Sequence, residues 1–204
     1  MGKDILLAHC PERILPGAVL KEIVENDRVI GGVTPQSTRA AKEIYASFVK
    51  GNLYETNDTT AELVKLMENT FRDVNIALAN EFAAVATGLG VNILEAIELA
   101  NKHPRVKILS PGIGVGGHCI PIVPWFIKQV DPGNARLILA ARGVNDEVPG
   151  RIAAKIKEIL KDIPPETKFM VFHPSWGYFA KEYNFIQWAL EVEGKEPKPK
   201  TPTK

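Results

Sequence analysis

The sequence has few cysteines, no excess of either charge and no long apolar run, and each shortage excludes a class of protein. Its 204 residues contain two cysteines, Cys10 and Cys119, too few for a disulfide framework. Lys and Arg number 25 and Asp and Glu 24, and the net charge of +1 argues against a nucleic-acid partner. The apolar runs are too short to span a membrane, and residues 1–20 lack the pattern of an export signal. We expect a soluble cytoplasmic protein.

The apolar spacing predicts an α/β fold that is predominantly helical, with short strands at the N-terminal and C-terminal ends. Strands are expected at 5–9, 29–33, 53–56 and 169–172. Helices are expected at 35–50, 93–102, 124–130 and 176–183, with two helical stretches, separated near Gly143 or Pro149, inside 134–163. Three regions follow: 1–57, a helical central region at 58–163 that contains the loop of Cys119, and 164–204. The last region is expected to hold a strand–helix–strand patch and a Lys/Pro-rich tail that we expect to be disordered.

The clearest helix runs from Thr59 to Thr87. Thr59 and Glu62 have the spacing of a capping box, and apolar residues then recur every three or four positions, at 63, 67, 71, 74, 78, 82 and 85. At 1.5 Å per residue this helix is about 40 Å long. We expect it to cross the molecule or to pair with its twin in a dimer.

The segment GIGVGGHCIPIVPWF, residues 112–126, has the composition of a loop that presents a reactive thiol. Its glycines allow backbone amides to approach a ligand, and the two prolines after Cys119 restrict the chain. Three glycines match G-x-G-x-x-G, but no strand precedes them and the prolines prevent a helix, so a dinucleotide fingerprint is not predicted. We interpret Cys119 as a nucleophile rather than a small buried residue, whereas Cys10 is expected in the core.

Other polar residues have two interpretations each. Lys65 and Asn69, one helical turn apart, belong either to a site or to a solvated face. Several asparagines on this helix, at 69, 75 and 80, indicate hydrogen-bonding groups in a partly buried site. Glu12 either faces a cleft or forms an ion pair with Arg13. The pairs His9-Cys10 and His118-Cys119 lack zinc-ligand spacing, so zinc is not expected.

Four stretches occur in the order seen in one family. They are CPERILPG (10–17), TTAELVKLMENTFRDVNIALANE (59–81), the glycine loop, and AARGVNDEVP (140–149). Over residues 5–160 the chain resembles the UDP-glucose/GDP-mannose dehydrogenase family, and within it the enzymes of nucleotide-sugar metabolism and polysaccharide biosynthesis that act on UDP-N-acetylmannosamine. His118 supports the branch for N-acetylated hexosamines, because the UDP-glucose branch favours serine there.

The resemblance implies an activity and a set of roles. Enzymes of this family use NAD to oxidise the sugar C6 alcohol to a carboxylate through a cysteine thioester. Cys119 would then be the nucleophile, Lys65 would stabilise the oxyanion, and Asn69 would hold the reacting oxygen or water. Glu12 would assist proton transfer during hydrolysis. The substrate, a UDP-N-acetylhexosamine, would be bound by Gly112, Gly114, Gly116, Gly117, His118 and Arg142, and the 59–87 helix would form a homodimer.

The chain departs from the family pattern in three respects. The pattern C-x-P-x-D-P has Val123 in the place of its Asp. The NAD-binding domain should precede residue 57, of which the chain retains the last strands, and a second nucleotide-binding domain should follow residue 163. We therefore expect a catalytic core that lacks turnover alone; the alternative is a non-catalytic module that dimerises or binds a ligand.

Residues 168–199 resemble a segment of the zinc- and manganese-binding receptors of ABC transporters. His173 matches a metal ligand of those receptors, so a metal-binding module is a further alternative, although one histidine does not make a site. We expect His173 to be structural, and the change of resemblance at Pro164-Pro165 indicates a fusion of two gene fragments.

Overall fold

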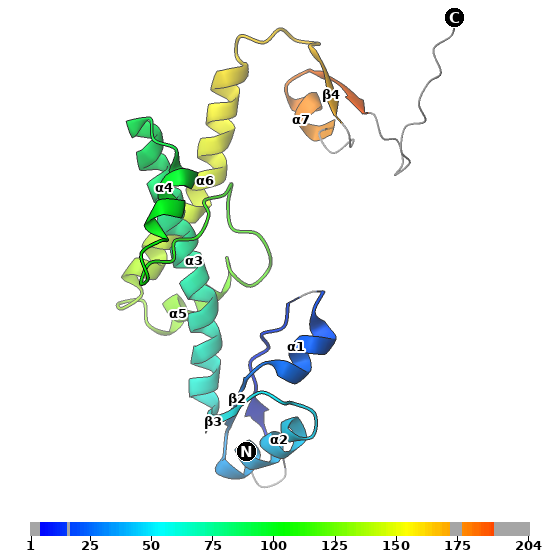
Figure 1. Cartoon of the computed structure of the whole chain (residues 1–204), viewed down its shortest axis with the longest axis vertical. Coiled ribbons are helices and arrows are strands. Elements are labelled where there is room, and N and C mark those ends of the chain that lie inside the picture. Colours follow the sequence, from blue (N-terminus) through cyan, green and yellow to red (C-terminus); the bar gives the residue numbers. More distant parts are fainter. Residues whose placement is uncertain (1–4, 16, 172–176, 190–204) are drawn as a thin grey trace, which may run out of the picture. The chain divides into compact units, whose positions relative to one another are not determined.

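The fold is α/β and predominantly helical, as predicted. The computed structural model describes residues 5–15, 17–171 and 177–189 (Figure 1). The chain divides into two compact units, Met1–Gly150 and Arg151–Lys204. The first unit holds a three-stranded sheet and most of the helices, and the second holds a two-stranded sheet. Among the described residues, no helix is long and apolar enough to cross a membrane.

The first sheet has β2 as its middle strand. Its elements are β1 (Ala8–His9), α1 (Val19–Glu25), β2 (Arg28–Gly32), α2 (Pro35–Ala46) and β3 (Leu53–Asn57). Strand β1 pairs antiparallel with β2, and β3 pairs parallel with it. Parallel neighbours require a crossover, which α2 supplies. The predicted strands are confirmed with small shifts, whereas α1 was not predicted; none of its residues is buried, so it has no core-facing stripe to detect.

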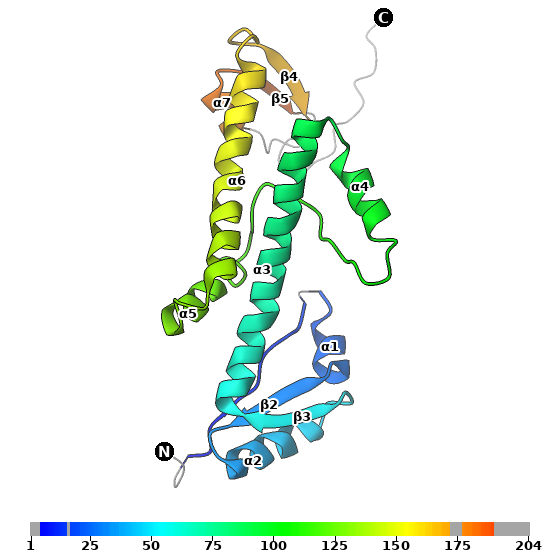
Figure 2. The ribbon, with the colours of Figure 1, turned by 90° about the vertical axis from the view of Figure 1, so that its left-hand side faces the viewer.

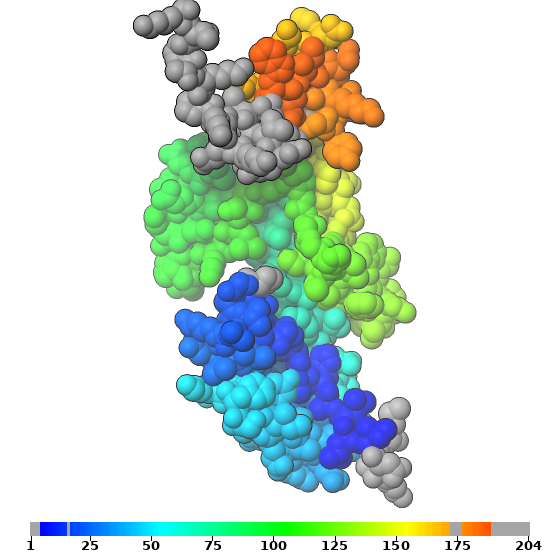
Figure 3. Space-filling model, turned by 90° about the vertical axis from the view of Figure 1, so that its right-hand side faces the viewer, coloured from blue at the N-terminus to red at the C-terminus, as the bar shows by residue number. Residues whose placement is uncertain are grey.

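Two glycines let the elements around β2 approach closely. A Cβ on Gly31 would lie 2.2 Å from the Asn57 carbonyl oxygen, and one on Gly32 would lie 2.3 Å from the Thr38 nitrogen. The Gly32 amide donates to Thr38 Oγ1 at 3.0 Å. Helix α2 therefore packs directly on the sheet, and the described residues of this region, blue to cyan in Figure 3, lie together.

Helix α3 (Asp58–Leu89) begins at a different residue from the predicted one. Asn57 is its N-cap, and the Asn57 side chain accepts a hydrogen bond from the Thr60 amide at 2.8 Å. The capping box at Thr59 is therefore wrong, because an Asn two residues earlier already satisfies the end of the helix. Gly90, with φ of 68°, ends α3 in the left-handed conformation.

Helix α3 buries small and polar side chains and exposes apolar ones. Its buried residues are Ala61, Asn69, Thr70, Asp73, Ala77, Ala79, Asn80 and Ala86. Most of the predicted apolar stripe is exposed, including Met67 at 58% and Phe71 at 65%. Within this chain, α3 thus packs against its neighbours through its small and polar side chains and leaves most of its apolar stripe exposed.

Three helices follow in the first unit. They are α4 (Ile93–Ala100), α5 (Val123–Val130) and α6 (Arg136–Leu160), which continues into the second unit. Helix α6 lies beside α3 (Figure 2). The predicted separation at Gly143 or Pro149 is wrong, because α6 is continuous with Pro149 inside it. Buried residues of α6, such as Arg142 and Asn145, hold the helix against its neighbours on both sides of Gly143.

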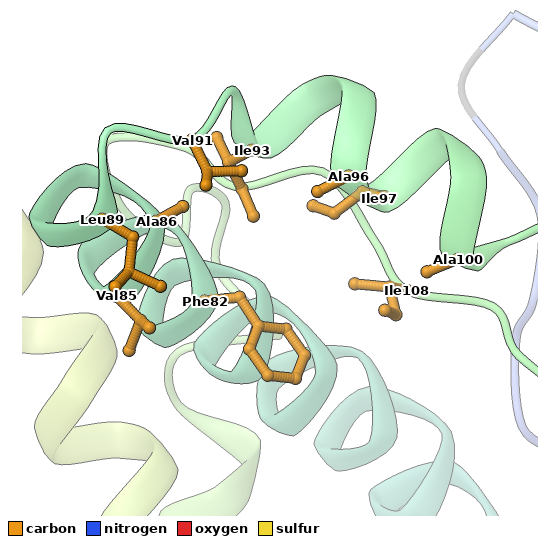
Figure 4. A pocket seen from close by; sticks show the side chains of 10 residues that line it. All are labelled: Phe82, Val85, Ala86, Leu89, Val91, Ile93, Ala96, Ile97, Ala100 and Ile108. Carbon is orange, nitrogen blue, oxygen red and sulfur yellow. The ribbon is translucent and has the colours of Figure 1, made fainter.

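An apolar hollow of about 270 Å³ lies between the C-terminal end of α3 and α4 (Figure 4). Ten apolar residues line it: Phe82, Val85, Ala86, Leu89, Val91, Ile93, Ala96, Ile97, Ala100 and Ile108. Asn92 caps α4, and its side chain accepts a hydrogen bond from the Leu94 amide at 3.1 Å.

The second unit contains a strand–helix–strand motif, as predicted. It consists of β4 (Lys168–Val171), α7 (Gly177–Glu182) and β5 (Ile186–Ala189), with the two strands parallel. Phe169 contacts Phe179 and Phe185 edge to face, with ring centroids 6.3 and 6.5 Å apart. His173 and the Lys/Pro-rich tail lie outside the described residues.

The N-cap of α3 can be tested by substitution. Asn57→Ala removes the acceptor for the Thr60 amide, and we expect it to lower the free energy of unfolding by about 1 kcal/mol. Thr59→Ala is the matched control, and it should cost much less. Urea denaturation measures both. A larger loss of unfolding free energy for Thr59→Ala than for Asn57→Ala would show that Thr59 caps the helix and would contradict the cap at Asn57.

Candidate functional site

One cleft in the first unit gathers all four residues predicted to be catalytic. The cleft has a volume of about 960 Å³. Its lining consists of Glu12, Arg13, Ile14, Leu15, Lys65, Met67, Glu68, Asn69, Phe71, Arg72 and Cys119. These residues come from three separate segments: the chain after β1, the first half of α3, and the loop before α5.

Glu12 is held by backbone amides and by a buried cation. Its Oε1 accepts from the amides of Arg13 and Ile14 at 2.6 and 2.8 Å. The guanidinium of Arg28, 2% exposed, lies 3.2 and 3.1 Å from the two carboxylate oxygens. Burial alone would raise the pKa of Glu12, but these hydrogen bonds and the Arg28 charge outweigh it and lower the pKa. Glu12 is therefore an ionised acceptor, and its Oε2 is the less occupied oxygen.

The predicted alternative, a Glu12–Arg13 ion pair, is wrong. Arg13 instead pairs with Glu68 of α3. The Arg13 backbone amide, not its guanidinium, contacts the Glu12 carboxylate. The geometric reason is that Glu12 turns toward β2, where Arg28 lies, while Arg13 turns toward α3.

Lys65 and Asn69 place a cation and an amide one helical turn apart in the cleft. The Lys65 ammonium donates to the Glu12 backbone carbonyl, which ties α3 to the segment after β1. An ammonium has three protons, so this bond leaves donors for a ligand. Asn69 is 1% exposed, and its Oδ1 accepts from Arg72 Nη2 at 2.5 Å. Among the described residues its amide N–H groups have no recorded partner.

Cys119 is exposed at the end of the glycine loop. Its carbonyl oxygen accepts from the amides of Ile122 and Val123 at 3.2 and 2.9 Å, and this turn leads into α5. Gly117, two residues before it, has φ of 85°, a conformation that a side chain would strain. The thiol is thus held between a glycine turn and a helix start.

The other predicted binding residues lie outside the lining of this cleft. Gly112, Gly114, Gly116, Gly117 and His118 are exposed on the loop before Cys119. Arg142 is 3% exposed on α6. It pairs with Asp73 at 2.6 Å and with Asp146, so its guanidinium is occupied by carboxylates of its own chain.

Sequence reasoning missed three arginines of the site. Arg28 fixes Glu12, Arg13 pairs with Glu68, and Arg72 contacts Asn69. For Arg72 a signal existed, because it lies three residues after Asn69 and hence on the same helical face. For Arg28 none existed, since only the sheet brings it to Glu12.

Cys10 differs from Cys119 in its surroundings. It is half-buried, and burial raises the pKa of its thiol, although a hydrogen bond with Tyr45 and the nearby Arg28 charge oppose the shift. Burial likewise raises the pKa of Tyr45. Cys10 is consequently a protonated, partly shielded thiol at neutral pH.

The described residues do not form a dinucleotide cradle. Gly31 and Gly32 lack a side chain that would keep another group away from the backbone, but Asn57 and Thr38 of the chain itself already occupy the space beside them. The glycines at 112–117 follow no strand and open no helix. Among the described residues there is also no group of three or more His, Cys, Asp or Glu that could hold a metal ion.

The chain belongs to the UDP-glucose/GDP-mannose dehydrogenase family. The model of the family's central domain matches residues 59–147, and the model of its NAD binding domain matches residues 1–49. Together the two matches cover more than half of the chain. The cofactor of the family is NAD, as expected from the sequence.

Similar proteins include dehydrogenases of N-acetylated sugars. The chain is 58% identical to a UDP-N-acetyl-D-mannosamine dehydrogenase from Methanococcus aeolicus, over 89% of this chain and 40% of the relative. It is 56% identical to an NDP-N-acetyl-D-galactosaminuronic acid dehydrogenase from Ralstonia solanacearum, over 76% of this chain and 37% of the relative. The structure of a UDP-D-ManNAc dehydrogenase from Pyrococcus horikoshii superposes with a TM-score of 0.80 at 43% identity, covering 93% of this chain and 50% of that one.

The chain spans about two fifths to one half of the length of these relatives. The match to the Methanococcus aeolicus protein covers 182 residues, which cannot fit inside residues 1–163. The likeness to dehydrogenases therefore extends beyond the join predicted at Pro164-Pro165.

The two thiols should react at different rates. We expect iodoacetamide at neutral pH to modify exposed Cys119 in a fast phase and shielded Cys10 in a slow one, because the thiolate is the reacting species. Peptide mass spectrometry assigns the sites. Cys119→Ser should remove the fast phase and Cys10→Ser should leave it. A fast phase that follows Cys10 would contradict the observed exposure.

Proposed function

We propose that this chain carries the thiol-bearing part of the site of an NAD-dependent UDP-N-acetylhexosamine 6-dehydrogenase, which oxidises the C6 alcohol to a carboxylate. The observation that carries the proposal is the meeting of Cys119, Lys65, Asn69 and Glu12 in one cleft. UDP-N-acetylmannosamine is the proposed substrate, in accord with the names of several similar proteins.

The first proposed covalent step occurs on a C6 aldehyde. The Cys119 sulfur forms a bond to the aldehyde carbon, and the electron pair of the C=O π bond moves to oxygen. The ammonium of Lys65 stabilises this oxyanion, which takes up a proton to give a thiohemiacetal. Asn69 lies one turn away with its N–H groups available to hold the same oxygen or a water.

The last proposed step is hydrolysis of a Cys119 thioester. A water oxygen adds to the thioester carbon and the carbon–sulfur bond breaks. The sulfur leaves as the thiol with one proton of the water, the other proton passes to solvent, and the carboxylate product forms. Glu12 Oε2 accepts a hydrogen bond from this water and orients it. Its lowered pKa makes it a weak base, so orientation is its larger contribution. The two oxidations need a hydride acceptor, which in this family is NAD+. The roles proposed for the described residues do not include hydride transfer.

We propose that Val123 lowers the activity of the site. It begins α5, and its amide donates to the Cys119 carbonyl oxygen, so its side chain follows the thiol by one turn. Valine cannot accept a proton or a hydrogen bond, whereas aspartate at a helix start is electrostatically favourable. Val123→Asp would add a second carboxylate next to the nucleophile.

The proposed assembly is a homodimer through α3. The support is the exposed apolar stripe of this helix, which includes Val85 at 59% and Leu89 at 72% exposure. The apolar hollow beside α4 continues this surface, because Phe82, Val85 and Leu89 line it (Figure 4). A monomer seldom leaves a stripe of this length in water. A non-catalytic dimerising module remains the alternative function, and activity distinguishes the two.

NADH production tests the proposal. The purified chain is given NAD+ and UDP-N-acetylmannosamine, and absorbance records NADH. Any turnover should fall by about three orders of magnitude in Cys119→Ser, because among the described residues no other thiol and no hydroxyl side chain lines the cleft. Val123→Asp should increase it.

The described residues hold no dinucleotide cradle, so we expect turnover by the chain alone to be low. Calorimetric binding of the UDP-sugar is therefore measured beside it. Absence of both turnover and binding in a folded chain would refute the enzymatic proposal and favour the dimerising module.

The dimer is tested by charge substitution in the α3 stripe. Val85→Glu with Leu89→Glu should convert a dimer to a monomer in sedimentation, since each places a charge in an apolar interface. Leu20→Glu, on exposed α1, is the control that should leave the dimer intact. A parent chain that sediments as a monomer would disprove this assembly.

A further inference from the structure

A buried polar chain connects the core between α3 and α6 to the first residue of the glycine loop. Four side chains take part, Asp73 and Asn80 on α3 and Arg142 and Asn145 on α6, and each is at most 4% exposed. Arg142 Nη1 donates to Asp73 Oδ1 at 2.6 Å. Such a buried ion pair seldom stabilises a fold more than apolar packing would. A role other than stability would therefore account for its presence.

The direction of each amide in this chain is fixed from its two ends. Asn145 Nδ2 lies 2.9 Å from both the carbonyl oxygen and Oδ1 of Asp73. Because a carboxylate and a carbonyl only accept, this atom of Asn145 must be the N–H₂ group. At the other end, Asn80 Oδ1 lies 2.9 Å from the Gly112 amide, which only donates.

The middle contact agrees with both ends. Asn80 Nδ2 donates to Asn145 Oδ1 at 3.3 Å. The order of donors therefore runs from Gly112 N–H to Asn80, from Asn80 to Asn145, and from Asn145 to Asp73. If neither the carboxylate nor the backbone carbonyl of Asp73 accepted from it, Asn145 could turn over, Asn80 would follow, and an N–H₂ group would then face the Gly112 amide.

We infer that Asn80 and Asn145 are positioning residues that relay the orientation set by the Asp73–Arg142 ion pair to Gly112, and so fix the start of the loop that presents Cys119. The relation to Cys119 chemistry rests on the proposed function, but the relay itself does not. At the other end of the loop, the turn from Cys119 into α5 supplies the second anchor. Among the described residues, the amides of Gly114, Gly116 and Gly117 between these anchors have no recorded hydrogen bond.

The test is amide hydrogen exchange of the substrate-free full chain, followed by NMR with global stability measured in parallel. In the parent, Gly112 should be protected, whereas Gly114, Gly116 and Gly117 should exchange rapidly. Asn80→Ala should speed exchange at Gly112 by about tenfold beyond the change in global stability, since a buried donor loses its partner.

Asn145→Ala should also speed exchange at Gly112, although Asn145 does not touch Gly112. The nearly isosteric Asp73→Asn should have a smaller effect, because the backbone carbonyl of residue 73 still accepts from Asn145. The matched control is Asn75→Ala on the same helix, whose side chain donates only to the Phe71 carbonyl oxygen. This control should leave Gly112 unchanged. The double variant Asn80→Ala/Asn145→Ala should add little to Asn80→Ala alone, because the two share one relay.

Asn80→Asp provides a rescue that depends on pH. When protonated, aspartic acid can donate to Asn145 and accept from Gly112, as asparagine does; when ionised, it only accepts. The ionised form still accepts from the Gly112 amide, but it sets a carboxylate oxygen against Asn145 Oδ1, and the repulsion should displace the side chain. The protection factor of Gly112 in this variant should therefore be higher near about pH 5 than near about pH 8, with no such change in the parent.

Unprotected Gly112 in the parent would overturn the relay, and so would a normal Gly112 in Asn145→Ala. Neither outcome depends on NAD, substrate or the role of Cys119. A failed dehydrogenase assay with the predicted exchange pattern would reject the proposed function alone.

Discussion

The constraint on which the structure depends is that α3 packs inside its own chain through its polar and small side chains. Ala61 at its start lies against the space left by Gly31 of β2, and Asp73 in its middle pairs with Arg142 of α6. With that face turned inward, Lys65 and Asn69 reach the cleft, and the apolar stripe points outward. A helix with a conventional apolar core face would have placed Lys65 in solvent.

The cleft follows from three attachments to this helix. The Lys65 ammonium binds the Glu12 carbonyl, and Arg13 pairs with Glu68. The Gly112 amide donates to Asn80 of α3, and the glycine loop that starts there ends at Cys119 in the cleft. Glu12 in turn is held by Arg28 from the middle strand of the sheet. The carboxylate, the ammonium and the thiol are therefore positioned by different elements. The carboxylate and the ammonium have hydrogen-bond partners, and the backbone of Cys119 is held by the turn into α5. Preorganisation of this kind is what covalent catalysis requires.

Local patterns predicted the elements well, and tertiary contacts explain the exceptions. Strand and helix positions followed from apolar spacing, and the catalytic candidates followed from composition and family motifs. The sequence could not reveal that Asn57 rather than Thr59 caps α3, since both residues are good caps. It also could not pair Arg28 with Glu12 or Asn145 with Asp73, because residues 16 and 72 positions apart meet only through the fold. Pro149 was expected to interrupt a helix that packing keeps continuous.

The most direct test of the central claim, that a sugar nucleotide occupies the cleft beside Cys119, is the alkylation rate of Cys119 with and without UDP-N-acetylmannosamine. The measurement needs neither cofactor nor turnover, and Cys10 in the same sample is an internal control. At a ligand concentration about ten times its Kd, we expect alkylation of Cys119 to slow about tenfold, since roughly a tenth of the molecules is then free, while Cys10 is unaffected. An unchanged rate at Cys119, with calorimetry showing that the sugar nucleotide is bound, would place the ligand elsewhere and contradict the account.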